Sequence, residues 1–196
     1  ILIIKADWAT KTTAEGLTHK QAQIKGLFNS VQSINLIEIP RSAKRKIGIA
    51  GNEGMKKTSQ QATEKEALAA INGTYYNMKV GNSTCFYKIN REVIDTTLNG
   101  EFNNRVNGAV REVKGKIKII DWNKEIETNY KRNKGTVLAS GPIMLENGRI
   151  SDWSACSKSF IDTRHPRSAI YTKKDGTIVF ITVDGYSRVR LIDVAQ

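Results

Sequence analysis

The residues best suited to chemistry lie at the two open ends of a predicted hairpin near the C-terminus. Arg164, His165 and Arg167 precede a β-branched run, and Asp184 follows the run that predicts its partner strand. The dipeptide Asp175-Gly176 between the runs is typical of a tight turn. Because an antiparallel pair brings its open ends side by side, these four side chains could gather. Arginine binds phosphate through its planar fork, and histidine can transfer a proton near neutral pH.

A purely structural interpretation of the same residues stays open. Arg167 and Asp184 could form an ion pair that stabilises the hairpin, while His165 caps a turn. Spacing alone does not separate this interpretation from a site that binds an anion.

Two further segments have glycines where a strand is expected to end. Asn72-Gly73 lies in the run 68–76, which predicts a buried strand with a kink at the glycine. This kink could face a ligand or be an ordinary bulge. Ser140-Gly141, followed by proline, interrupts a second apolar strand and could present its hydroxyl and amide groups to a ligand. The flanking pattern of a hydrolase nucleophile elbow is missing, so Ser140 is not predicted to be a nucleophile.

The pattern of the whole chain predicts an α+β fold, a strand-rich single domain with a mixed or mainly antiparallel sheet and few helices. A helix is expected from Thr58 as N-cap, with Gln61 reaching back to it. The other expected elements are an opening apolar strand within 1–10, a strand over 31–39, a hairpin over 109–122 around Gly115, an interrupted strand over 136–145, and a turn at Asn147-Gly148.

Composition favours an anionic partner. The 196 residues include 31 basic and 19 acidic side chains, a net charge of +12 at pH 7. Such a charge suits phosphorylated glycans, nucleic acid or another acidic surface, although solubility alone also explains it. No apolar run approaches the roughly 20 residues of a membrane-spanning helix. The chain begins with isoleucine, so we expect a processed or trimmed product whose targeting segment is not visible.

The cysteines and the missing motifs limit the cofactor chemistry. Cys85 and Cys156 lie far apart and form no CxxC pair, which excludes a cysteine-based zinc site. They could form one disulfide in an oxidising compartment or remain two buried thiols. Because no phosphate-binding loop, dinucleotide fingerprint or HExxH occurs, we predict no cofactor, and the sequence leaves open whether a metal is needed.

Taken together and in order, these segments resemble the phosphodiester glycosidase domain family. The resemblance is carried by Ala70 to Tyr76, by Ala139 to Pro142, by Arg164 to Ile170, and by Asp175-Gly176 with Thr182 to Gly185. Members cleave a sugar from a sugar-phosphodiester and leave a phosphomonoester. The resemblance therefore implies a sugar-phosphodiester or phosphorylated glycan as partner, with no nucleic acid, and an exported protein of the periplasm, cell surface or medium.

The resemblance also implies roles for individual residues. Asp184 and His165 are the expected catalytic residues. Substrate binding is expected from Arg167, Arg164, Asn72, Gly73, Ser140 and Gly141. Family domains continue into a Gly-rich segment that follows a helix, whereas this chain stops at Gln196. We therefore expect residues 1–196 to form one phosphodiester glycosidase-like domain that is incomplete at its C-terminus, and such a truncated form could be inactive.

A second hypothesis is a non-catalytic module that binds an anionic glycan or polymer through a basic face. Arg41, Lys44, Arg45 and Lys46 form the densest basic run in the sequence, although such a run is also common in solvated turns. The two hypotheses differ in their response to salt. Polymer binding should weaken steeply as salt rises, whereas a glycosidase should depend on Arg167 and Asp184.

Overall fold

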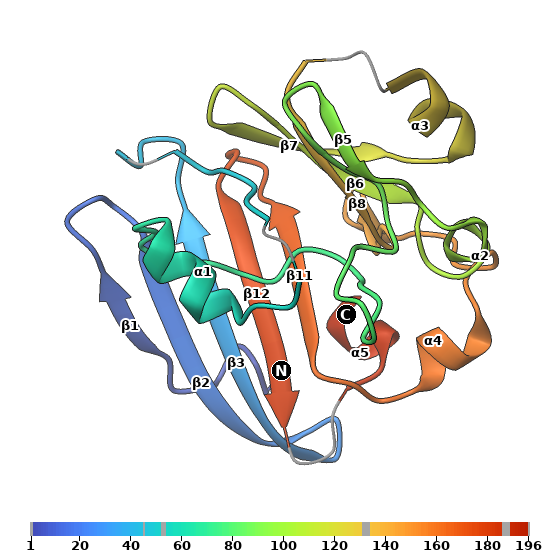
Figure 1. Ribbon diagram of the computed structural model, residues 1–196. Coiled ribbons are helices and arrows are strands. Elements are labelled where there is room, and N and C mark those ends of the chain that lie inside the picture. Colours follow the sequence, from blue (N-terminus) through green and yellow to red (C-terminus); the bar gives the residue numbers. More distant parts are fainter. Residues whose placement is uncertain (1, 45, 52–53, 131–133, 186–188, 196) are drawn as a thin grey trace. The chain divides into compact units, whose positions relative to one another are not determined.

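The backbone divides into two units, each built on its own five-stranded sheet (Figure 1). The computed structural model describes residues 2–44, 46–51, 54–130, 134–185 and 189–195. The first unit comprises residues 1–45 and 161–196, and the second comprises residues 46–160. None of the helices in the described ranges is long and apolar enough to cross a membrane.

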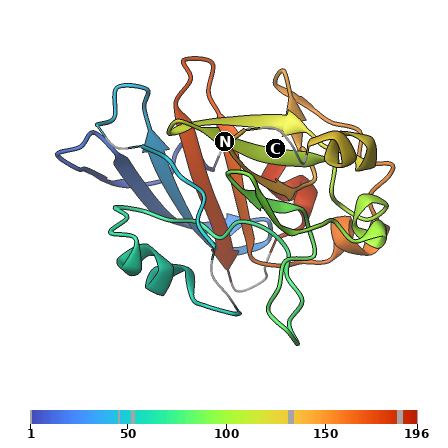
Figure 2. The same cartoon turned by 45° about the horizontal axis from the view of Figure 1, so that its top comes forward.

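The sheet of the first unit is antiparallel throughout, in the order β1-β2-β3-β12-β11 (Figure 1). Its strands are β1 (Ala9–Thr12), β2 (Thr18–Leu27), β3 (Ser30–Ile39), β11 (Arg167–Thr172) and β12 (Ile178–Gly185), and the helix α5 spans Leu191–Ala195. Figure 2 shows the β11–β12 hairpin, in orange and red, from a second side.

Register explains where the core of the first unit lies. Ala22, Ile34 and Val183 are direct partners across three adjacent strands, and each is at most 4% exposed. Directly paired residues project from the same face, so these three form one apolar row. Val189 and Val194 join the same cluster and cover this face.

The second unit contains an antiparallel sheet in the order β5-β4-β8-β6-β7. Its strands are β4 (Tyr87–Ile89), β5 (Glu92–Asp95), β6 (Gly108–Val113), β7 (Lys116–Asp121) and β8 (Thr136–Ser140); β9 (Leu145–Glu146) and β10 (Arg149–Ile150) form a separate hairpin. Its helices are α1 (Thr58–Glu64), α2 (Asn99–Phe102) and α3 (Lys124–Tyr130), while α4 (Lys158–Asp162) spans the boundary between the units.

Aromatic rings form the centre of the second core. The ring of Trp122 lies 5.1 Å from that of Phe86 and 5.2 Å from that of Tyr130, measured between centroids. Val137 and Ala139 of β8 are fully buried in the same cluster. Aromatic pairs at these distances add stabilisation beyond the area they bury, so this cluster holds α3 against the sheet.

These elements confirm the predicted α+β, strand-rich and antiparallel fold. The strand over 31–39, both predicted hairpins and the turn at Asn147-Gly148 are also confirmed. The helix begins at Thr58, but its N-cap is Lys57, whose amide donates to Gln60 Oε1 at 3.3 Å.

Two predicted strands are wrong. The apolar run at the N-terminus forms turns over residues 2–5, and the first strand begins only at Ala9. Residues 68–75 form no strand, and Leu68 is 46% exposed. The segment is held by side-chain hydrogen bonds and not by the backbone hydrogen bonds of a sheet. For example, the Thr74 hydroxyl donates to the Ala139 carbonyl at 2.6 Å.

Candidate functional site

The expected catalytic segment of the first unit forms a short bridge just before β11. The His165 amide donates to the Val189 carbonyl at 3.0 Å, and the Val189 amide donates back to the His165 carbonyl at 3.2 Å. Val189 is fully buried in the core, whereas His165 is exposed. The bridge therefore fixes the histidine backbone to the core and leaves its side chain at the surface.

The two flanking arginines bind main-chain carbonyls. Arg167 donates through Nη2 to the Thr163 carbonyl at 2.8 Å and through Nε to the Val189 carbonyl at 3.4 Å. Arg164 donates through Nη1 to the Phe28 carbonyl at 3.3 Å, at the turn between β2 and β3. Both side chains are half-buried. These hydrogen bonds orient the two guanidinium groups.

A buried carboxylate that the sequence reasoning missed lies beside this segment. Asp193 of α5 is 6% exposed and accepts from Arg190 at three positions, including Nη2 at 2.9 Å and the main-chain amide at 2.9 Å. Burial alone would raise the pKa of Asp193, but the hydrogen bonds from Arg190 and the charges of Arg190 and Arg164 lower it. The i, i+3 spacing of Arg190 and Asp193 was the signal available in the sequence.

The structure does not place Asp184 beside Arg167 as the sequence reasoning expected. Arg167 is paired with Val183, so its side chain lies on the core face of the sheet. Asp184 is the next residue along β12 and projects from the opposite face, because side chains alternate along a strand. It is exposed there, and its Oδ1 accepts from the Gly185 amide at 2.8 Å.

In the second unit, the structure brings the two glycine-containing segments together. Thr74 bonds to the Ala139 carbonyl at 2.6 Å, and the Tyr75 hydroxyl donates to the Gly141 carbonyl at 2.6 Å. Asn72 and Gly73 are exposed just before this contact. A Cβ added to Gly73 would lie 2.5 Å from Leu138 Cδ2, so glycine allows the segment to approach β8.

Gly141 occupies a position that no other residue fits. A Cβ at Gly141 would collide with the Arg105 carbonyl oxygen and would lie 3.0 Å from the Asn107 amide nitrogen. The peptide bond from Gly141 to Pro142 is cis. Ser140, half-buried at the end of β8, precedes this turn. The sequence therefore located a tightly constrained strand end correctly.

A second arginine site near these segments escaped the sequence analysis. Arg105 forms a two-pronged bond with Glu101, at 2.7 and 2.9 Å, and its guanidinium carbon lies 3.7 Å from the centroid of the Tyr75 ring. Burial would lower the pKa of Arg105, but its bonds to Glu101 raise it. This stacked ion pair fixes Tyr75 and therefore the segment that carries Asn72.

The cysteines are both free thiols, but the alternative of two buried thiols holds only for Cys85. Cys85 is fully buried, and burial raises its pKa, while Cys156 is only partly buried. Within the described ranges, no group of three or more histidine, cysteine or acidic residues is arranged to hold a metal ion.

The predicted basic run is divided between the units. Arg41 and Lys44 belong to the first unit and Lys46 to the second, while Arg45 lies outside the described residues. The Arg41 guanidinium lies against the β11–β12 turn at Gly176, and its charge helps to lower the pKa of Asp175, after the bonds from Thr177.

Comparison with known proteins now identifies the class. A family model described as phosphodiester glycosidase matches residues 65–196, more than half of the chain. The chain therefore belongs to the phosphodiester glycosidase family, which supports a glycosidase-type function. This confirms the resemblance drawn from the sequence segments.

Among solved structures, the fold is similar to that of a zebrafish protein. That structure is described as the catalytic domain of N-acetylglucosamine-1-phosphodiester alpha-N-acetylglucosaminidase, auto-inhibited by its pro-peptide. It matches 97% of the present chain with a TM-score of 0.58 and 16% sequence identity, and the present chain spans 64% of its length. None of the curated proteins matches the chain.

Proposed function

We propose that this chain is a hydrolase that cleaves a sugar from a sugar-phosphodiester and leaves a phosphomonoester. The observation that carries the proposal is the segment from Arg164 to Arg167, which lies within the family match and holds two half-buried guanidinium groups on either side of an exposed histidine. We further propose that residues 1–196 act as one glycosidase-like domain. We also propose that the protein is exported, as members of this family are.

The chemistry of a sugar-phosphodiester determines which steps of the reaction need help from protein side chains. A phosphomonoester is already a stable anion, so its departure needs less protonation than the departure of a sugar alkoxide. The harder tasks are binding the phosphate and stabilising positive charge at the anomeric carbon. We assign phosphate binding to Arg167, with Arg164 as a weaker second contact, and a proton or hydrogen bond to the phosphate to His165.

The remaining assignments concern the sugar. Asp184 stabilises the oxocarbenium-like centre or activates water, and its position near the end of β12 leaves it accessible from solvent. Asn72, Gly73, Ser140 and Gly141 belong to the second unit, and we assign them to substrate binding because the family resemblance does. Glycosidases ordinarily use two carboxylates, so a second one is required beside Asp184.

The direct test is hydrolysis of a synthetic N-acetylglucosamine-1-phosphodiester by the wild-type chain and two arginine variants. Arg167→Gln should lower kcat/KM by about a hundredfold or more, which is the loss expected for a charged contact in the transition state. Arg149→Gln is the matched control, because Arg149 is exposed in β10. Melting curves should show that both variants remain folded.

Each result separates the hypotheses. Equal activity in Arg167→Gln and wild type would remove Arg167 from the phosphate site. No hydrolysis of any sugar-phosphodiester by wild type, together with salt-sensitive binding of an anionic glycan that tolerates the loss of Arg167, would instead favour the non-catalytic module. Asp184→Asn tests the proposed carboxylate in the same assay.

A further inference from the structure

A row of cations crosses the sheet of the second unit. Lys88 of β4 and Arg111 of β6 are both partners of Val137 on the intervening strand β8, and Arg111 is in turn the partner of Lys118 on β7. Direct partners project from one face, so the three cations share a face with Val137, which is fully buried. On this face of the sheet, the apolar core is therefore followed by a strongly positive region formed by the three cations.

A groove lies at this positive end. It has a volume of about 390 Å³ and is lined by Arg111, Val113, Lys114, Lys116, Ile117 and Lys118. No ion pair joins a carboxylate to a cation of this groove within the described ranges. Glu112, the acidic residue within β6, projects from the opposite face and accepts from the Gly115 amide at 2.5 Å.

Two buried donors at this place have no acceptor among the described residues. They are Nε of Arg111, which lines the groove, and the hydroxyl of Tyr130, a neighbour of Arg111 that is not part of the groove lining. Tyr130 is 8% exposed, and the Arg111 guanidinium carbon lies 6.0 Å from the centroid of its ring. Leaving such donors unpaired costs stability, and folded proteins rarely do so without a function. The pair therefore suits an acceptor supplied by a ligand.

The surrounding charge points to the same kind of ligand. Burial lowers the pKa of Lys88, and the charges of Arg111 and Arg91 lower it further. These groups repel one another, and a bound anion would relieve the repulsion. A phosphate group offers several acceptor oxygens and up to two negative charges at neutral pH, which matches a guanidinium beside a hydroxyl and an ammonium.

We infer that Arg111, Lys118 and Tyr130 form an oxyanion-binding site that takes a phosphate group, either free inorganic phosphate or the phosphate of a phosphorylated sugar. The site uses none of the residues assigned to catalysis, so the test of this site does not depend on the proposed function.

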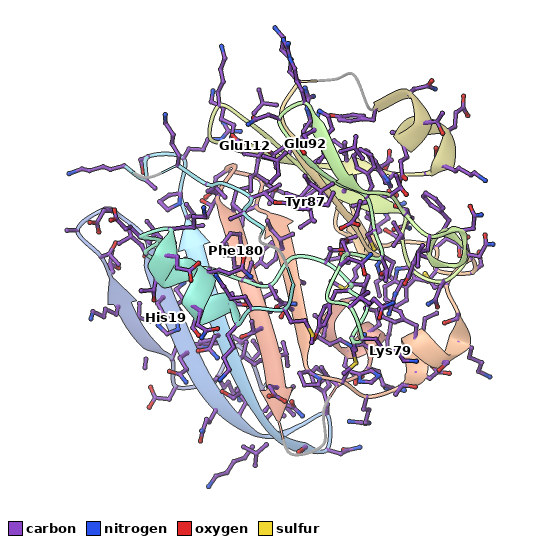
Figure 3. The ribbon with its side chains drawn as sticks, viewed as in Figure 1. His19, Lys79, Tyr87, Glu92, Glu112 and Phe180 are labelled. Carbon is purple, nitrogen blue, oxygen red and sulfur yellow. The ribbon has the colours of Figure 1, made fainter. Side chains whose placement is uncertain are left out.

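The test is calorimetric titration of the full chain with inorganic phosphate, in chloride buffer at constant ionic strength, together with melting curves. Phosphate should bind wild type at a saturable site and raise its melting temperature. Arg111→Gln should weaken binding by about tenfold or more, and Tyr130→Phe should weaken it less, because it removes one neutral donor. Lys79→Gln, the matched loss of one positive charge, should bind like wild type. In Figure 3, Lys79 lies well apart from Glu112, the neighbour of Arg111 in β6.

A folding defect would not imitate the expected result. Arg111→Gln removes a charge that repels Lys88 but also the contact with the Tyr130 ring, so the melting temperature of this variant is measured without phosphate as well. Weaker binding by an equally stable variant therefore supports the site. Equal binding by Arg111→Gln and wild type would overturn it, as would an equal loss in Lys79→Gln, which would indicate general screening.

Two further arms identify the source of the phosphate. Tighter binding of glucose 6-phosphate than of inorganic phosphate, with the same dependence on Arg111, would assign the site to phosphorylated sugars. Equal or weaker binding would assign it to free phosphate. Both assignments would be overturned in favour of nucleic acid if a single-stranded oligonucleotide displaced phosphate from wild type and did not bind Arg111→Gln.

Discussion

Glu127 gives the sharpest prediction about what holds the second unit together. This carboxylate of α3 is 7% exposed and accepts three hydrogen bonds. The Thr97 amide donates to Oε1 at 2.9 Å, the Thr97 hydroxyl donates to Oε2 at 2.6 Å, and Trp122 Nε1 also donates to Oε2 at 2.9 Å. The helix, the core tryptophan and the segment after β5 therefore meet at one side chain.

Replacing Glu127 with glutamine keeps its size but turns one acceptor into a donor. The amide oxygen can still accept from one side, but Trp122 or Thr97 then faces an NH₂ group. Thr97 cannot compensate fully, because its hydroxyl oxygen already accepts from the Phe86 amide at 2.9 Å. The substitution loses one charged hydrogen bond and leaves a buried donor unpaired, so it should lower the free energy of unfolding by about 2–3 kcal/mol.

The assay is thermal unfolding monitored by tryptophan fluorescence and near-ultraviolet circular dichroism. At about 4 °C per kcal/mol for a unit of this size, Glu127→Gln should lower Tm by about 8–12 °C. Glu125→Gln is the matched control, because Glu125 is exposed in the first turn of the same helix, and it should cost about 0.5 kcal/mol or less. A Tm for Glu127→Gln equal to that of the control would refute the reasoning.

Three more predictions concern both units. Gly141→Ala should destabilise the second unit by about 2–4 kcal/mol in chemical unfolding, because its Cβ would collide with the Arg105 carbonyl, and an unchanged midpoint would contradict this packing. Glu38 is partly buried, and burial alone would raise its pKa. Hydrogen bonds and charges of Lys173 and Lys20 instead lower this pKa below the ordinary value of 4.5. Its contribution, about 0.5–1 kcal/mol, is therefore present above pH 4.5 and lost as pH falls through the lowered value, so unfolding curves of Glu38→Gln and wild type should converge in acid. A maleimide should modify Cys156 in the native protein, whereas Cys85 should react only after denaturation, and mass spectrometry of the native product would expose the opposite order.

Elements with local signals could be predicted from the sequence. The β6–β7 hairpin has Lys114 and Gly115 in its turn, with φ values of 53° and 79°. Two successive residues with positive φ match the twist of the flanking strands, and a glycine at the second place marks such a turn. Asp175-Gly176 marked the β11–β12 hairpin as well, although in that turn Gly176 has a positive φ, of 83°, and Asp175 does not. Turn and alternation are short-range properties, which explains why these predictions are confirmed.

The run 68–76 shows where such reasoning fails. Its apolar residues and its Asn72-Gly73 pair resemble a strand with a kink, yet the segment lies against β8 without a ladder. Its position depends on bonds from Thr74 and Tyr75 to residues 65 and 66 positions later in the chain. A single sequence does not reveal such distant partners. It could nevertheless identify the glycine, because Gly73 permits the close approach to Leu138.

The sequence did not predict the strand register in the candidate site of the first unit. The hairpin did bring its open ends together, but Arg167 pairs with Val183 and not with Asp184. A shift of β12 by one residue would place Arg167 and Asp184 on one face, and it would also move Val183 out of the core. Because Val183 is 3% exposed and packs in the apolar row with Ile34, the core forbids that shift. A substrate that contacts both Arg167 and Asp184 must therefore reach side chains on opposite faces of the sheet.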